Sequence, residues 1–323
     1  MNSPTNDPHN FDDEKLHVIA VISNPARYKR RYELYLQFRD YMEANPKVVL
    51  YTVEAATGTR PFEVTEPNNP RHMQLRTNED LWIKESMQNC AMAMIPVDAK
   101  YIAFIDADIK FARHDWAEET IHMLQSFPVV QMFSAVAMLD NNYVPQYIAS
   151  GFAAKYSKSI SLFDKEDSLV LKEYGRSLYK TGLAFAFRKA EFEAMGGWYD
   201  RAIVGSGDYH FSAACINRVE WTLPVGIDTR YREAVKLWGT HVYSIIRGRI
   251  GYVDGLISHY WHGEMVNRRY GPRWAILKEF DPNTYIQHDW KNHGLIMYTK
   301  IGLESKIPQY LYEYFRLRNE DSV

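Results

Sequence analysis

Apolar runs alternate with segments of helical periodicity along the first half of the chain. Residues 16–22 and 101–105 are short and almost wholly apolar, which is typical of strands buried on both faces of a parallel sheet. A helix is predicted between them, because apolar residues recur on one face at helical spacing: Leu34, Phe38, Tyr41 and Met42. This alternation predicts right-handed βαβ units, and therefore an α/β fold with a mainly parallel sheet flanked by helices.

The same pattern predicts the remaining elements. Strands are expected over residues 48–53, 129–133, 182–187 and 250–258, and helices near Asn78, after Asp115 and over residues 189–195. The helix near Asn78 carries an apolar stripe made of Ile83, Met87, Cys90, Ala91 and Met94. Residues 55–77 are rich in Pro, Thr and Asn and predict a long loop, which inside a compact domain is often functional.

The elements group into one main domain with two ends. We expect a disordered tail at residues 1–14, a main domain at residues 15–262, and a helical extension of that domain at residues 263–323. The main domain divides into halves at residues 15–135 and 136–262, because strand–helix alternation gives way to a mixed pattern in the second half. A chain of 323 residues with 46% hydrophobic and 24% charged content is an ordinary globular protein.

Composition excludes several classes of protein. A net charge of -2 argues against a surface built to coat nucleic acid, although it leaves room for a local basic face. The two cysteines, Cys90 and Cys215, are too few for a disulfide framework and predict buried thiols in a reducing compartment. We expect a cytoplasmic protein with no membrane span, because no run approaches about 20 apolar residues and the first residues are polar.

Two carboxylates stand at the end of a predicted buried strand. Asp106 and Asp108 follow residues 101–105, and open α/β sheets bind their ligands just beyond the carboxyl ends of their strands. Such a pair can hold Mg²⁺ or Mn²⁺, which in turn holds the oxygens of a diphosphate. The alternative interpretation is a solvated turn, with Asp108 capping the next segment. The position of the pair favours the metal.

A glycine-rich segment in the second half is the next candidate. The sequence GGWYD at residues 196–200 is followed by GSGD at residues 205–208. Glycines allow a tight turn and a close approach to a substrate, and an aromatic residue offers a flat face to a sugar ring or a base. Asp208 could orient or deprotonate an acceptor hydroxyl. A plain helix N-cap is the competing interpretation of Asp208.

Histidines and clustered arginines complete the candidates. His259 and His262 follow a predicted strand, and either imidazole could complete a metal shell, with His262 preferred because it precedes Gly263. Their spacing is not that of a helical zinc-protease motif. Two basic clusters could bind the phosphates of a donor or of a nucleic acid: Arg27, Lys29, Arg30 and Arg31, and Arg247, Arg249, Arg268, Arg269 and Arg273. For the first cluster, a solvated helix face is the favoured interpretation.

Taken in order, these motifs resemble the GT-A glycosyltransferase superfamily over residues 16–263. SNPAR at residues 23–27 is similar to its nucleotide-contacting loop, and DAD at residues 106–108 to its metal-binding DxD. The resemblance implies that residues 15–135 bind a nucleotide-sugar and residues 136–262 an acceptor. It implies nucleotide contacts from Asn24, Arg27, Glu54, Lys84, Asn89 and Asp106, metal ligation by Asp106, Asp108 and His262, and an acceptor site of Gly197, Trp198, Tyr199, Asp200 and Asp208.

The implied reaction moves a sugar from a nucleotide diphosphate, most simply a UDP-sugar, to an acceptor hydroxyl with Mn²⁺ or Mg²⁺ and with Asp208 as base. The chain also looks like short glycosyltransferases of bacteriophages and large DNA viruses, which would place it in the host cytoplasm. The acceptor is then a glycan or a hydroxymethylated pyrimidine in DNA. A sugar-nucleotide pyrophosphorylase and an inactive glycan- or DNA-binding module are the alternatives. The sugar, the stereochemical outcome and the oligomeric state stay open.

Overall fold

The computed structural model describes residues 14–158, 172–173, 176–177, 179–269 and 271–321. The expected disordered tail lies outside the described residues, apart from Glu14. No helix in the described part of the chain has both the length and the apolar character needed to cross a membrane. Both cysteines are free and buried, as the sequence predicts.

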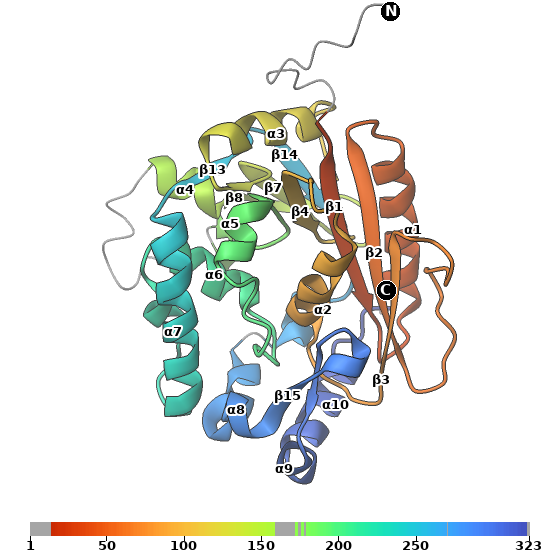
Figure 1. Cartoon of the computed structure of the whole chain (residues 1–323), viewed down its shortest axis with the longest axis vertical. Helices are drawn as coiled ribbons and strands as arrows, with labels where there is room; N and C mark the ends of the chain where they lie inside the picture. Colours follow the sequence, from red (N-terminus) through yellow and green to blue (C-terminus); the bar gives the residue numbers. More distant parts are fainter. Residues whose placement is uncertain (1–13, 159–171, 174–175, 178, 270, 322–323) are drawn as a thin grey trace, which may run out of the picture.

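A seven-stranded sheet forms the centre of the molecule, in the order β13-β6-β12-β4-β1-β2-β3 (Figure 1). Its parallel core confirms the predicted fold class and consists of β1 (Leu16–Ser23), β2 (Val48–Thr57), β3 (His72–Thr77) and β4 (Tyr101–Ile105). The strand β12 (Ala184–Arg188) runs antiparallel between β4 and β6 (Val129–Gln131), and β13 (Ile250–Tyr252) pairs parallel with β6. Because β12 is antiparallel, its first residues lie at the carboxyl end of β4.

Both faces of this sheet are buried, which explains why its strands are apolar without alternation. Along β4, Ile102 and Phe104 belong to one hydrophobic core, while Tyr101, Ala103 and Ile105 belong to the other. The helices α1 (Lys29–Glu43) and α3 (Trp116–Ser126) cover the second core. Helix α2 (Lys84–Ala91) covers the first, together with α5 (Lys189–Ala194), α6 (Gly207–Cys215) and α7 (Thr229–Ile246).

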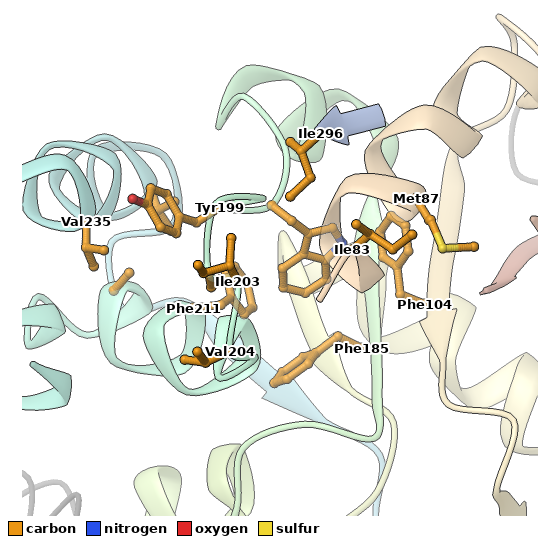
Figure 2. Packing of buried hydrophobic residues seen from close by; sticks show 14 of the residues in the cluster. Ile83, Met87, Phe104, Phe185, Tyr199, Ile203, Val204, Phe211, Val235 and Ile296 are labelled. Atoms are coloured by element: carbon orange, nitrogen blue, oxygen red, sulfur yellow. The ribbon is translucent and has the colours of Figure 1, made fainter. Parts of the chain in front are cut away.

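Aromatic rings fill the core between β4, β12 and α6. Figure 2 shows Phe104, Phe185 and Phe211 entering it from these three elements. Phe187 is fully buried, with ring centroids 5.4 Å from Phe211 and 5.5 Å from Trp198. Edge-to-face contacts of this kind add to the free energy gained from burying the rings. The core therefore anchors the segment that contains Trp198.

A second sheet adjoins the first and has five strands, in the order β11-β8-β7-β14-β5. Its members are β5 (Ile109–Phe111), β7 (Ala135–Leu139), β8 (Pro145–Gly151), β11 (Tyr179–Lys180) and β14 (Leu256–His259). The chain passes from β4 in the first sheet to β5 in the second through Asp106, Ala107 and Asp108. Antiparallel pairing of β14 with β5 sets His259 opposite Ile109, one residue from Asp108.

The structure corrects several predicted elements. The expected loop at residues 55–77 contains β3, whose alternating apolar and polar residues lie beside β2. The helix expected near Asn78 begins only at Lys84. Residues 250–258 form two strands in different sheets, β13 and β14. Tyr41 of α1 is only partly buried, although the periodicity predicted it on the apolar face. Tyr35 of the same helix is buried in the core instead.

Beyond Gly263 the chain is helical with loops, as predicted, but it also contains a hairpin. Short helical segments at Met265–Arg268 and Pro272–Glu279 lead to α8 (Pro282–Tyr285), followed by β15 (Ile286–Asp289) and β16 (Leu295–Tyr298). The last helices are α9 (Lys300–Glu304) and α10 (Ile307–Leu317). The end of the chain returns to α1 (Figure 1), where Asp321 accepts hydrogen bonds from the backbone N–H groups of Lys29 and Arg30. Shorter elements are α4 (Phe152–Lys158), β9 (Lys172–Glu173) and β10 (Arg176–Ser177).

The aromatic core gives a direct test of the packing. Replacing Phe187 with Ala is expected to lower the free energy of unfolding by about 3–5 kcal/mol, because it leaves a cavity among rigid rings. Urea unfolding followed by fluorescence measures the change. The control is Val97→Ala at a side chain that is 94% exposed, and its effect should stay within about 0.5 kcal/mol. Equal effects of the two substitutions would contradict the assignment of Phe187 to the core.

Candidate active site

Asp106 stands where the chain leaves β4. Its backbone N–H donates to Leu183 O at 2.8 Å, just before β12. Its carboxylate forms an ion pair with the ammonium of Lys84, the first residue of α2. Burial raises the pKa of Asp106, although the charge of Lys84 opposes this shift. Lys84 therefore lies beside Asp106 and partly neutralises its charge.

Asp108 is enclosed by two histidines. His262 Nε2 lies 2.9 Å from Asp108 Oδ2, and His259 Nε2 lies 3.7 Å from Asp108 Oδ1. One ligand atom from each of the three residues falls within 4.8 Å of the others. The pairing of β5 with β14 produces this arrangement, because Tyr260 N also donates to Asp108 O at 2.8 Å. The structure thus brings both histidines to Asp108, whereas the sequence could not choose between them.

The chemistry of these three side chains fits a divalent cation. Within the described residues, no hydrogen-bond donor reaches Asp108 Oδ1, although the atom is buried. Burial lowers the pKa of His259 to about 3, so its imidazole is neutral and keeps a lone pair for a metal. Burial alone would raise the pKa of Asp108, but the two histidines and Arg268 hold it well below its usual value. Oxygen and imidazole ligands together suit Mn²⁺ better than Mg²⁺, which prefers oxygen alone.

A pocket beside the DxD holds Asp208. Its space amounts to about 310 Å³ when the open solvent at its mouth is included, and it is lined by Lys84, Glu85, Gln88, Phe104, Asp106, Gly182, Leu183, Ala184, Phe185, Trp198 and Asp208. Asp208 is the second residue of α6, and its Oδ2 accepts a hydrogen bond from Thr181 Oγ1 at 3.3 Å. A Cβ on Gly182 would lie only 2.2 Å from this oxygen. The absence of a side chain at Gly182 therefore makes room for the Asp208 carboxylate.

The GGWYD segment contributes only in part to this pocket. Asn89 holds the backbone of Trp198 through two hydrogen bonds, of 2.9 Å to its N–H and 3.0 Å to its carbonyl. A Cβ on Gly197, where φ is +78°, would come within 2.6 Å of Asn89 Oδ1. Asn89 therefore fixes this turn, and the expected contact with the nucleotide is not supported. Only Trp198 of this segment lines the pocket, among the residues that the structure describes.

Tyr199 and Asp200 depart from the predicted acceptor role. Tyr199 is 7% exposed and packs against Tyr231 and Trp238 in the core. Asp200 pairs with His288 Nε2 at 2.8 Å, on the hairpin strand β15. Successive side chains in the segment 196–200 point in different directions, so Trp198 lines the Asp208 pocket whereas Tyr199 and Asp200 do not.

A second pocket gathers three of the residues predicted to contact a nucleotide. Asn24, Arg27 and Glu54 line it together with Tyr32, Ala55, Ala56, Thr57, Arg60, Pro61 and Glu63. The side chain of Arg27 is 61% exposed and lies 3.8 Å from a Glu63 carboxylate oxygen. The residues therefore come together as predicted, at the ends of β1 and β2.

Glu54 and Asn24 also have structural roles in this second pocket. The buried carboxylate of Glu54 accepts four hydrogen bonds from residues 63–65, including three from backbone N–H groups. Asn24 accepts from Tyr28 N at 2.9 Å and donates to Tyr28 O at 2.8 Å. These contacts hold the pocket walls in place. Both Glu54 oxygens therefore already accept hydrogen bonds from the protein, and a direct contact of this carboxylate with a nucleotide stays a prediction.

Sequence reasoning missed Glu85. This residue lines the Asp208 pocket, is 5% exposed, and accepts a 2.9 Å hydrogen bond from Trp82 Nε1. A Cβ on Gly207 would lie 2.3 Å from Glu85 Oε1, so the start of α6 packs against this carboxyl group. Burial raises the pKa of Glu85 to about 7. The sequence around Glu85 does not reveal this setting, because Gly207 and Asp208, which lie beside it, come from a segment more than a hundred positions away.

Most arginines of the second predicted basic cluster contact the protein itself. Arg273 is 6% exposed and donates to Ser206 Oγ at 2.6 Å. Arg268 donates to the ring of His262, and Arg249 to Ser126 O at 3.1 Å. In the first cluster, Arg31 pairs with Glu320. The two clusters therefore do not form one continuous basic surface among these residues.

No protein-family model matches the chain, and no curated protein matches its sequence. Solved structures resemble it at low identity. The catalytic domain of Drosophila β1,4-galactosyltransferase 7, in complex with xylobiose, is 13% identical with a TM-score of 0.34, and the match covers 62% of this chain and 60% of that one. Staphylococcus aureus TarS is 13% identical with a TM-score of 0.43, over 78% of this chain and 38% of TarS.

A third structure is a glycosyltransferase involved in glycosylation of the major capsid of PBCV-1. It is 10% identical with a TM-score of 0.33, over 79% of this chain and 97% of that one. The chain thus spans less than two thirds of the Drosophila and TarS structures. At this level of similarity the residues of the site, and not the names, carry the argument for function.

The pKa of His210 gives a test of the helix that contains Asp208. Burial lowers this pKa from 6.5 to about 3, and the ring contacts Thr222 and Tyr231. The unfolded chain binds a proton below pH 6.5 that the folded protein does not, so stability should fall as the pH falls from 6.5 toward 3. The slope is about 1.4 kcal/mol per pH unit for each such imidazole.

The expected result is that His210→Gln unfolds with a shallower pH dependence than the unmodified protein. Urea unfolding at several pH values between 7.5 and 5 measures it. His122→Gln is the control, because that side chain is 74% exposed, and its pH dependence should match the unmodified protein. Identical slopes for all three proteins would show that His210 is not held neutral.

Proposed function

We propose that this chain is a metal-dependent glycosyltransferase that transfers a sugar from a nucleotide diphosphate to an acceptor hydroxyl. The observation that carries the proposal is the group of Asp108, His259 and His262, beside a pocket that contains Asp106 and Asp208. A cation site next to a pocket with a potential base is what a sugar transfer from a diphosphate requires. The GT-A resemblance of the sequence motifs points to the same reaction.

Asp108, His259 and His262 would hold the cation. A bound Mn²⁺ or Mg²⁺ would neutralise the negative charge that develops on the departing diphosphate. Asp106, which is paired with Lys84, would bind the cation or the ribose of the donor. The Lys84 ammonium adds a fixed positive charge at this edge of the sheet, where the phosphate oxygens would lie.

Asp208 is proposed as the base that accepts the proton of the acceptor hydroxyl. It lies on the first turn of α6 and shares its pocket with Asp106. Trp198 and Phe104 supply apolar walls to this pocket. The second pocket, with Arg27 at its rim, is proposed for the nucleotide base and ribose, and UDP is the proposed nucleotide.

Of the two acceptor classes, the contacts favour a glycan over hydroxymethylated DNA. Duplex DNA carries regularly spaced phosphates and is bound by basic side chains that face solvent. Arg31, Arg268 and Arg273 instead interact with Glu320, His262 and Ser206. Assays with oligosaccharides and with hydroxymethylcytosine DNA separate the two acceptors.

Substitution of Asp108 tests the cation site. Asp108→Asn should weaken Mn²⁺ binding by more than about 100-fold, since even residues behind the ligands typically contribute about 10–100-fold. Release of UDP from UDP-glucose, UDP-galactose and UDP-N-acetylglucosamine should be lost in parallel. Titration of the electron paramagnetic resonance signal of free Mn²⁺ measures affinity.

Asp115→Asn is the matched control, because this acid lies downstream of the same strand and pairs with Arg113 on an exposed face. Its Mn²⁺ affinity should equal that of the unmodified protein. Undiminished Mn²⁺ binding in Asp108→Asn would contradict the metal site, and no UDP release by the unmodified protein from any donor would contradict the enzymatic function.

Substitution of Asp208 tests the base. Asp208→Asn should lower kcat by about 10²–10⁴-fold while Mn²⁺ binding persists, because general base catalysis contributes in that range. The pH–rate profile of UDP release should also lose its acidic limb. Asp200→Asn is the control in the same segment, since Asp200 pairs with His288, and it should retain rate and profile. An unchanged profile in Asp208→Asn would exclude Asp208 as the base.

A further inference from the structure

A buried carboxylate from the end of the described chain lies behind the proposed metal ligand His262. Glu320 is 1% exposed, although it stands among the last described residues. Its Oε2 lies 3.8 Å from His262 Nδ1, while Nε2 of the same ring lies 2.9 Å from Asp108. The imidazole is therefore placed between two carboxylates, one at each of its nitrogen atoms.

Glu320 is fixed from several directions. Arg31 contacts both of its oxygens, at 2.8 Å for the pair Nη2–Oε1, and Arg31 also donates to Ser23 O at the end of β1. Arg318 Nε donates to Glu320 Oε1 at 2.6 Å. Two guanidinium groups keep the carboxylate ionised, because a buried charge is tolerated when it is paired.

The backbone beside His262 is fitted to this segment. Gly263 has φ +90°, and a Cβ there would lie 2.9 Å from Glu320 Cα and 3.1 Å from Asn319 O. The peptide that follows His262 thus packs directly against the peptide that carries Glu320. Gly263 permits this approach, so the position of His262 depends on the segment that contains Glu320.

A neutral imidazole has a single N–H, so the nitrogen that binds a cation determines which nitrogen carries the proton. If Nε2 binds a cation, the proton must be on Nδ1, and that N–H faces Glu320. Metal-binding histidines in proteins commonly direct their second nitrogen to a carboxylate, which sets the tautomer and raises the basicity of the ligand. Arg268 Nη2 lies 2.6 Å from His262 Nε2 and 3.1 Å from Nδ1, so a cation bound at Nε2 must displace this guanidinium, and Glu320 is then the carboxylate that faces Nδ1.

We infer that Glu320 is a positioning residue of the metal site, which holds His262 in the Nδ1–H tautomer and so presents Nε2 to a divalent cation. This inference rests on the proposed function, since it requires that Asp108, His259 and His262 bind a metal. It assigns to residues 318–320 a role in cation affinity in addition to their packing.

The experiment compares Mn²⁺ affinities, measured by electron paramagnetic resonance on the full chain. Glu320→Gln, which removes the charge and retains the shape, should bind Mn²⁺ about 10–100-fold more weakly than the unmodified protein. Glu320→Asp keeps the charge but moves the carboxylate away from His262, so it should bind Mn²⁺ with intermediate affinity. This variant provides the test if Glu320→Gln does not fold. Asp321→Asn is the control, because it loosens the same segment from Lys29 and Arg30 and leaves His262 untouched.

Nitrogen NMR of the histidine rings with Mg²⁺ gives a second readout that simple packing would not change. The Nδ1–H signal of His262 should be present in the unmodified protein and in Asp321→Asn, and shifted or lost in Glu320→Gln. If Glu320→Gln or Glu320→Asp folds and binds Mn²⁺ as tightly as the unmodified protein, the role of Glu320 is excluded while the metal site stands. If the unmodified protein binds no Mn²⁺, the proposed function fails first.

Discussion

Burying a carboxylate at the end of a strand costs several kcal/mol unless opposite charges surround it, and this constraint organises the centre of the molecule. Asp106 is balanced by Lys84, and Asp108 is enclosed by two histidines. One oxygen of Asp108 still has no hydrogen-bond partner among the described residues. This oxygen, together with the two imidazole rings beside it, is the observation on which the proposed cation site rests.

Strand pairing delivers these groups to one place. The chain crosses from one sheet to the other through the DxD, and the register of β14 against β5 then sets the histidines beside Asp108. The antiparallel strand β12 brings Gly182 to the carboxyl end of β4, and with it the surroundings of Asp208. Two sheets and one antiparallel strand thus join acids that are a hundred residues apart in sequence.

The parallel core of the sheet could be predicted from the sequence, because apolar runs are a local signal. The pair Asp106 and Asp108 could be recognised as candidate ligands for the same reason. The structure places His262 beside Asp108, and Lys84 beside Asp106 in a pocket that Asp208 also lines, while the roles expected for these residues stay predictions. The sequence was not sufficient for roles set by distant contacts. Asn89 and Glu54 serve the protein's own backbone, Asp200 pairs with a hairpin that was not foreseen, and Glu85 lies among groups from remote segments.

The close approach of Asp208 to Gly182 carries a wider meaning. The Asp208 carboxylate occupies space that a side chain at residue 182 would fill, so the position of its charge depends on the absence of a side chain there. A methyl group at residue 182 would displace the carboxylate while leaving the strand intact. Such a protein would keep its fold and yet hold the carboxylate proposed as the base in a different place.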